Sequence, residues 1–215
     1  MKRALPVVAY LLLLGASPPQ LAPMSFFITS AGSGDGANLG GLEGADKRCE
    51  DLAAAAGGGA LQWRAYLSAT AEAGKPAVHA KDRIGRGPWH NAKGVKVADN
   101  VTDLHSDNNK LSKENSLSEK GTVVNGRGDT PNMHDIITGS NLDGTLYVAD
   151  GYDNCNNFRS NTTGTGSVRV GHIDRVGGGE VPTSWGSAHS SRGCSQPNLV
   201  ATGGAGFFYC FGMPR

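Results

Sequence analysis

The chain has 215 residues, with 20 Lys and Arg against 19 Asp and Glu, so its formal net charge is +1. This balance leaves no basic stripe that could follow a phosphate backbone, and we exclude nucleic acid as a partner. Glycine accounts for 32 residues, about twice its usual share of ~7%, and is scattered through turn-like segments. Many tight turns between short elements are therefore expected.

The N-terminus has the layout of a secretory signal peptide. Lys2 and Arg3 precede an apolar run, residues 4–14, which small residues follow. The run is shorter than the ~20 residues that a membrane-spanning helix needs. We predict a signal peptide over residues 1–22, no membrane span, and one domain over residues 23–215. The mature protein is expected to be secreted, periplasmic or at the cell surface.

The cysteines indicate disulfide bonds. An even number of cysteines after a secretory signal is typical of an oxidising compartment. Their spacing is too wide for the close Cys or His pairs of a structural zinc site. Two disulfides are predicted, with three pairings open at this point. The four residues are Cys49, Cys155, Cys194 and Cys210.

Hydrophobic periodicity predicts the elements in the first third of the chain. Residues 25–29 (SFFIT) are typical of a short strand. In residues 41–59 (GLEGADKRCEDLAAAAGGG) apolar residues recur at three- and four-residue steps, which predicts a helix that ends at Gly57 and turns Cys49 inward. Residues 61–69 (LQWRAYLSA) alternate between apolar and polar, as in a half-buried strand.

The rest of the chain is rich in loops. A weaker helical pattern covers residues 76–83, and residues 85–143 are mostly polar, with short apolar runs. Further strands are predicted at residues 146–149, 168–173 and 206–212. One clear helix, many short strands and long loops predict an α+β fold with antiparallel sheets.

The sequence contains no motif of an enzyme. Neither G-x-S-x-G nor H-E-x-x-H occurs. The six histidines are dispersed without ligand spacing, and each is more typical of a surface or hydrogen-bonded residue. A hydrolase stays open as an alternative, and it would require His134 and Asp135, or His105 and Asp103, to converge in a cleft.

A calcium site is the best metal candidate. Residues 99–114 place oxygen-bearing side chains at positions 1, 5, 7 and 12 of a calcium-loop count. His105 and Asn108 stand where an oxygen ligand and a glycine belong, which excludes an EF-hand. A looser Ca²⁺ site and a solvated polar loop are the two interpretations. The candidate ligands are Asp103, Asp107, Asn109 and Glu114.

Residues 125–135 (NGRGDTPNMHD) contain the adhesion tripeptide Arg127-Gly128-Asp129. The same residues are explained by a turn, because Asn-Gly is a turn dipeptide, glycine permits positive φ, and proline fixes the exit. We predict a rigid turn within the ligand-binding loops and no integrin binding, with Arg127 and Asp129 free to touch another ligand.

Three stretches, in order, resemble the endostatin domain, which has a C-type-lectin-like fold. They are GLEGADKRCEDLAAAAGGGALQWRAYLSA, TGSNLDGTLYVADGYDNCNNFRS and CSQPNLVATGGAGFFYCFG, and they surround all four cysteines. The chain is still more similar to secreted bacterial lectin-like proteins that share RIGRGPWHNAKG and NGRGDTPN. This resemblance implies the pairing Cys49–Cys210 and Cys155–Cys194. It would staple the first helix to the last strand.

The activities of these relatives do not transfer residue by residue. Gln196-Pro197-Asn198 follows the third cysteine, whereas sugar-binding C-type lectins carry this motif before the second, and Trp-Asn-Asp is absent. Collagen endostatins bind zinc through N-terminal histidines, and this chain has none before His79.

The resemblance does imply that the fold binds a partner. We expect a secreted, non-enzymatic binding domain whose long loops recognise carbohydrate or an extracellular or envelope protein surface. A structural or cell-surface interaction protein without a small ligand is the alternative. For the aromatic candidates, burial beneath the loops is an equally open interpretation. The candidate ligand-binding residues are Trp89, His90, Arg127, Asp129 and Tyr152.

Overall fold

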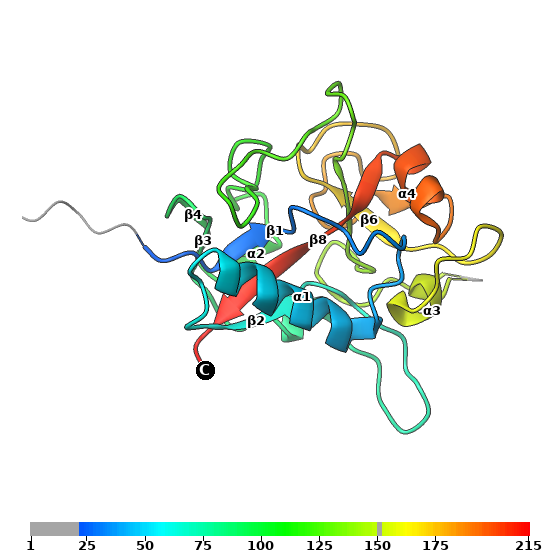
Figure 1. Ribbon diagram of the computed structural model, residues 1–215, viewed down its shortest axis with the longest axis horizontal. Helices are drawn as coiled ribbons and strands as arrows, with labels where there is room; N and C mark the ends of the chain where they lie inside the picture. The colour runs from blue at the N-terminus through cyan, green and yellow to red at the C-terminus, as the bar shows by residue number, and fades with distance from the viewer. Residues whose placement is uncertain (1–21, 150–151) are drawn as a thin grey trace, which may run out of the picture.

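The computed structural model describes residues 22–149 and 152–215, and over these residues the fold is α+β with mixed sheets and two disulfides (Figure 1). The predicted signal peptide, residues 1–22, lies outside the described residues except for its last position. None of the helices in the described ranges is both long and apolar enough to cross a membrane.

The C-terminal strand β8 (Gly204–Met213) forms the centre of the main sheet (Figure 1). It pairs antiparallel with β1 (Phe26–Ile28) and β2 (Gln62–Ala65) through its second half. Its first half pairs with β5 (Asp135–Ile137), and this pair is parallel. The prediction of purely antiparallel sheets was therefore wrong at this one pair, because β5 reaches β8 from a long loop and not through a hairpin.

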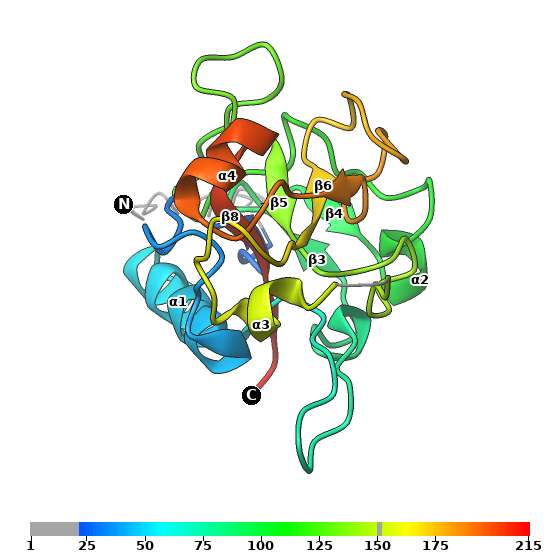
Figure 2. The same cartoon turned by 90° about the vertical axis from the view of Figure 1, so that its right-hand side faces the viewer.

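Beyond β5 the sheet continues antiparallel through β6 (Arg169–His172) and β7 (His189–Ser190). The seven-residue helix α4 (Gln196–Thr202) leads directly into β8 and lies beside it (Figure 2). β3 (Trp89–His90) and β4 (Lys96–Ala98) form a separate two-stranded sheet.

Two hydrophobic clusters cover the two faces of β8. Its side chains alternate, so Phe208 and Cys210 join one cluster while Phe207, Tyr209 and Phe211 join the other. The long helix α1 (Gly41–Ala55) covers the first face (Figure 1). Long loops cover the second face. Full burial of one such aromatic side chain stabilises the fold by ~1.5–3 kcal/mol.

The two disulfides connect the pairs that the resemblance implied, Cys49–Cys210 and Cys155–Cys194. The first joins the buried face of α1 to β8 across 161 residues, and the second closes a loop of 39 residues. Loop-closure entropy assigns them about 5 and about 4 kcal/mol of stabilisation.

Most of the predicted elements are confirmed. The helix and the strands at residues 25–29, 61–69, 168–173 and 206–212 correspond to α1, β1, β2, β6 and β8, although β1, β2 and β6 are shorter than predicted. The helix predicted for residues 76–83 is only a 3₁₀ turn, Ala80–Asp82, and residues 146–149 contain an isolated bridge instead of a strand. The four-residue helix α2 (Val101–Leu104) lies in the segment expected to be loop.

The short helix α3 (Asn154–Phe158) is left-handed. All five residues have φ between 49° and 64°, a conformation that costs ~1–2 kcal/mol for each ordinary residue. Three are asparagine, which tolerates it best. The turn is held by Asn157, which accepts a hydrogen bond from the Thr70 backbone, and by the disulfide at Cys155.

We predict that this backbone conformation is measurable at Asn156, whose side chain is exposed. Asn156→Ala should be less stable than Asn156→Gly by about 1 kcal/mol, because both remove the amide but only alanine has a Cβ that opposes positive φ. Urea unfolding of the two variants gives the difference. An alanine variant as stable as the glycine variant would contradict the left-handed conformation.

Candidate metal centre

Four side chains meet at one end of the main sheet. Asp135 is the first residue of β5, His172 is the last of β6, and His189 is the first of β7. Because these neighbouring strands are antiparallel, a strand start and a strand end lie side by side, and Asp135 is directly opposite His172. His134 precedes β5 and stacks on His172, with ring centroids 4.3 Å apart.

The Asp135 carboxylate is the centre of this cluster. Its Oδ1 lies 3.3 Å from Nε2 of His134, 3.3 Å from Nε2 of His172 and 3.6 Å from Nε2 of His189. The Nε2 atoms of His172 and His189 are 2.9 Å apart. Among the described residues, His134, Asp135 and His172 form the one group of three or more His, Cys, Asp or Glu side chains that is close enough to hold a metal ion.

The cluster is largely withdrawn from solvent. The Asp135 side chain is 2% exposed and His172 is 0% exposed, whereas His189 is 20% exposed. Neither carboxylate oxygen of Asp135 has a hydrogen-bond partner among the described residues. A buried carboxylate without donors is costly, so this site calls for a cation.

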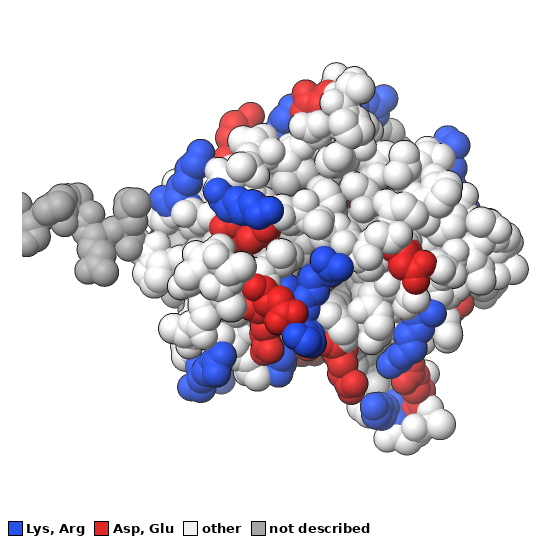
Figure 3. All heavy atoms as spheres, viewed as in Figure 1, with Lys and Arg blue, Asp and Glu red and all other residues white. Residues whose placement is uncertain are grey.

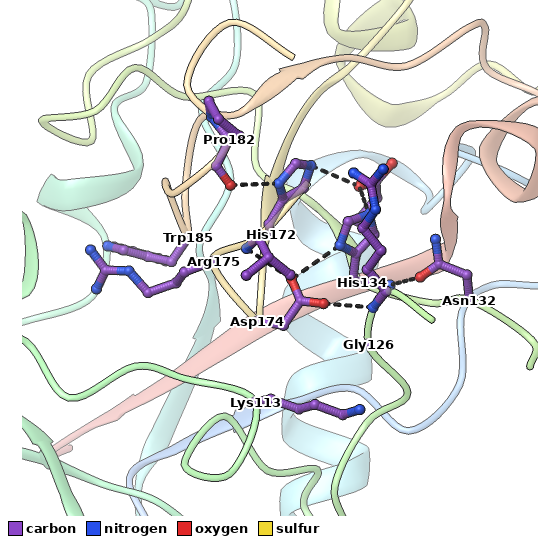
Figure 4. Close-up of polar contacts among 12 residues, drawn as sticks. Lys113, Gly126, Asn132, His134, His172, Asp174, Arg175, Pro182 and Trp185 are labelled. Atoms are coloured by element: carbon purple, nitrogen blue, oxygen red, sulfur yellow. Dashed lines mark hydrogen bonds and ion pairs between the residues drawn. The ribbon is translucent and has the colours of Figure 1, made fainter. Parts of the chain in front are cut away.

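The other ring nitrogens determine what faces Asp135. His172 Nδ1 lies 2.8 Å from the carbonyl of Pro182 (Figure 4). His189 Nδ1 lies 3.2 Å from the carbonyl of Ser190. Carbonyl oxygens only accept, so both Nδ1 atoms carry a proton, and in the neutral rings both Nε2 atoms present lone pairs. Two lone pairs at 2.9 Å, beside a carboxylate oxygen, repel one another unless a cation lies between them.

Bond geometry fits a tetrahedral metal. For metal bonds of ~2.0–2.1 Å, the ligand atoms of a tetrahedron are about 3.3 Å apart. Asp135 Oδ1 lies at this separation, 3.3 Å, from both His134 Nε2 and His172 Nε2, and the ligand atoms of these three residues all lie within 4.8 Å of one another. Imidazole nitrogens beside a carboxylate oxygen suit a transition metal better than Ca²⁺, which takes six or more oxygens.

When no metal is bound, a proton on His172 can supply part of the positive charge beside Asp135. Burial opposes the protonation of His172, but the adjacent Asp135 carboxylate and the Pro182 carbonyl favour it more strongly, so the pKa of His172 is raised.

Asp174 orients the remaining histidine. Its Oδ1 lies 3.1 Å from His134 Nδ1, and its Oδ2 accepts a hydrogen bond from the Arg127 backbone at 2.6 Å (Figure 4). Burial opposes the ionised carboxylate, but these contacts outweigh it and lower the pKa of Asp174. A carboxylate behind a histidine that faces a metal is a common outer-shell arrangement.

The Arg-Gly-Asp segment is therefore part of the support of the site. Its backbone holds Asp174, and Asp129 closes the turn by accepting hydrogen bonds from the Gly126 backbone and from Lys113. The lysine contact, followed by the Gly126 contact, lowers the pKa of Asp129. A rigid turn was predicted, and this arrangement agrees with it, but the Asp129 carboxylate is engaged in the turn itself.

A pocket of about 500 Å³ opens above the cluster. His189 is the most exposed of the three histidines at its wall, whereas His134 and His172 lie buried behind it. The residues around it are Arg127, Asn132, His134, His172, Gly178, Gly179, His189, Ser190, Arg192 and Thr202.

The structure separates the predicted ligand-binding residues. Trp89 is 1% exposed and packs against Phe211, beneath the long loops. The prediction that it contacts a ligand was therefore wrong, and it is a residue of the hydrophobic core. Tyr152 is half-buried, and its hydroxyl accepts a hydrogen bond from the Arg169 backbone. His90 lines a different pocket with Pro88 and Met213. Only Arg127 of the five lines the pocket above the cluster.

The four calcium candidates do not come together. Asn109 is buried, and its carboxamide oxygen accepts a hydrogen bond from Arg175 at 3.1 Å. Asp107 is fully exposed and lies 3.8 Å from the same guanidinium. Asp103 accepts from a backbone nitrogen of its own loop, and Glu114 accepts from a nearby serine. A positive guanidinium between the first two disfavours a cation there.

The interpretation of the histidines as dispersed was wrong for three of the six. His134, His172 and His189 are far apart in sequence, and only strand pairing brings them together. The hydrolase alternative requires His134 and Asp135 to converge, and these two side chains do lie 3.3 Å apart. The second pair, His105 and Asp103, does not converge. His105 Nε2 lies 2.7 Å from the Tyr66 hydroxyl, whereas Asp103 accepts a hydrogen bond from the Asp99 backbone.

One face of the molecule gives no indication of a large charged partner. On the face shown in Figure 3, basic and acidic side chains are interspersed without a continuous stripe of one sign.

No protein-family model matches the chain, and no curated protein matches it.

We predict that, at a pH above the raised pKa of His172, where this ring is neutral, Asp135→Asn leaves the metal-free protein as stable as the parent, or more stable. The amide can donate to the imidazole lone pairs that the carboxylate cannot satisfy. Urea unfolding in the presence of a chelator measures this. A loss of ~3–5 kcal/mol, as from a broken buried ion pair, would show instead that the carboxylate is a structural charge.

Proposed function

We propose that the protein is a secreted, metal-dependent binding domain that holds one transition-metal ion, with Zn²⁺ the best fit. The observation that carries this proposal is the convergence of three imidazole Nε2 atoms on an unpartnered buried carboxylate at separations of 3.3 to 3.6 Å. His134, Asp135 and His172 are the proposed ligands, and His189 stands at the side of the site that faces the pocket.

The site has features of a ligand-accessible centre. Three of its side chains are nearly fully buried and rigidly supported, while His189 lies at the pocket wall and is 20% exposed. A closed structural zinc site has no such opening. A bound metal supplies a Lewis acid at the pocket floor. The protein residues supply the orientation of the rings, through Asp174 and Pro182, and the exclusion of water from Asp135.

The binding function agrees with the fold that the sequence resembles. We propose a C-type-lectin-like, endostatin-like domain, supported by the α+β architecture and by the nested disulfides Cys49–Cys210 and Cys155–Cys194. The disulfides and the signal-like N-terminus support secretion. A carbohydrate or a group on an extracellular protein is the proposed partner, approaching through the pocket instead of through the calcium candidates.

We predict that the metal-free protein binds one equivalent of Zn²⁺. His172→Ala and Asp135→Ala should each weaken binding by more than the ~10–100-fold that loss of an outer-shell partner costs. His90→Ala is the matched control, because this half-buried histidine lies outside the cluster, and it should bind zinc normally. Isothermal titration calorimetry measures the affinities. Zinc binding that survives His172→Ala, or no binding by the parent, would contradict the proposal.

Asp174 gives a second test. Asp174→Ala should weaken Zn²⁺ binding by ~10–100-fold, because His134 loses the acceptor that orients its ring. Asp51→Ala is the control, since this exposed carboxylate pairs only with Lys47 on α1. Competition with a chromophoric chelator measures both variants. Equal affinities would remove Asp174 from the support of the site.

A further inference from the structure

The charge of the pocket above the metal centre is positive. Arg127 and Arg192 line it, and no Asp or Glu is among the residues at its wall. Neither guanidinium forms an ion pair with any residue in the described ranges. Two cationic groups beside a metal cation repel one another unless an anion lies between them.

The backbones of both arginines are fixed, while their side chains are exposed. The Arg127 backbone donates to Asp174 at 2.6 Å. The Arg192 backbone donates to the Thr202 hydroxyl at 3.0 Å. Both side chains project from anchored points at the pocket wall, an arrangement that suits recognition of a bound group.

A neutral donor faces the same space. The Asn132 side-chain oxygen accepts from the His134 backbone, which leaves its amide group as a donor at the pocket wall (Figure 4). With the guanidinium groups, the pocket offers hydrogen-bond donors around the exposed edge of the cluster, as an oxyanion requires.

Gly177 and Gly179 pass close to the side chains that line the pocket, where only glycine fits. A Cβ at Gly177 would lie 2.8 Å from the His172 ring and 3.1 Å from the Arg127 guanidinium, and a Cβ at Gly179 would lie 2.7 Å from the His189 ring. The same distances place the Arg127 guanidinium close to the cluster. Any side chain at these two positions would collide with the groups that line the site.

We propose that this pocket binds a small molecule carrying an oxyanion group, such as a phosphate, sulfate or carboxylate. The oxyanion faces the metal centre, and Arg127, Arg192 and Asn132 donate hydrogen bonds to it. The pocket volume of about 500 Å³ exceeds what an inorganic anion fills, so the ligand is an anionic molecule that extends beyond its oxyanion group. This inference rests on the proposed metal-binding function and names the class of its ligand.

The test uses the Zn²⁺-loaded protein and four probes: inorganic phosphate, glucose 6-phosphate, glucuronate and glucose. Calorimetry should detect binding of at least one of the three anions and no binding of glucose. The sugar phosphate and the uronic acid distinguish a tetrahedral from a planar oxyanion. Glucose binding as tight as that of the anions, or no anion binding by zinc-loaded protein, would overturn the inference.

The arginines are tested separately from the metal. Arg127→Ala and Arg192→Ala should each reduce anion affinity by on the order of tenfold or more while Zn²⁺ affinity is retained. Arg86→Ala, which removes an exposed arginine at another pocket, is the matched control. Unchanged anion affinity in the double variant would overturn the inference and leave the metal site intact. If the parent protein does not bind zinc at all, the proposed metal-binding function itself fails.

Discussion

The buried carboxylate of Asp135 is the interaction on which the site depends. It is surrounded by three imidazole nitrogens, and no group among the described residues donates a hydrogen bond to it. Removal of a charge from water is tolerated only when another charge or a metal compensates it. The hydrogen bonds behind the rings direct their lone pairs toward Asp135. The burial of Asp135 and the orientation of the imidazole rings around it therefore both favour a cation beside this carboxylate.

The fold makes this arrangement rigid. β5 is held between β8 on one side and β6 on the other, so Asp135 cannot move without disturbing the central strand. β8 is itself joined to α1 by Cys49–Cys210. The Arg-Gly-Asp turn, which resembles an adhesion loop, contributes through its backbone to Asp174 and through one exposed arginine to the pocket.

The sequence predicted the parts of the fold that local patterns encode. The three- and four-residue spacing of apolar residues in α1 and the strand alternation around Trp63 are local, and a motif resemblance supplied the disulfide pairing. The site is not local. His134, His172 and His189 are brought together by strand register, which single-sequence periodicity does not contain. Trp89 shows the same limit, since its burial against Phe211 depends on distant loops. One signal was present: a His-Asp pair at the start of the apolar strand β5.

X-ray absorption spectroscopy of the zinc-loaded protein tests the central claim most directly, because it reports the ligands themselves. Two imidazole nitrogens and one carboxylate oxygen at ~2.0–2.1 Å are predicted, with an oxygen from solvent completing a four-coordinate geometry. The Asp135→Asn protein should lose or alter the carboxylate contribution while the imidazole signal of His134 and His172 persists. A shell of oxygens alone, without imidazole scattering, would contradict a metal centre at the end of this sheet.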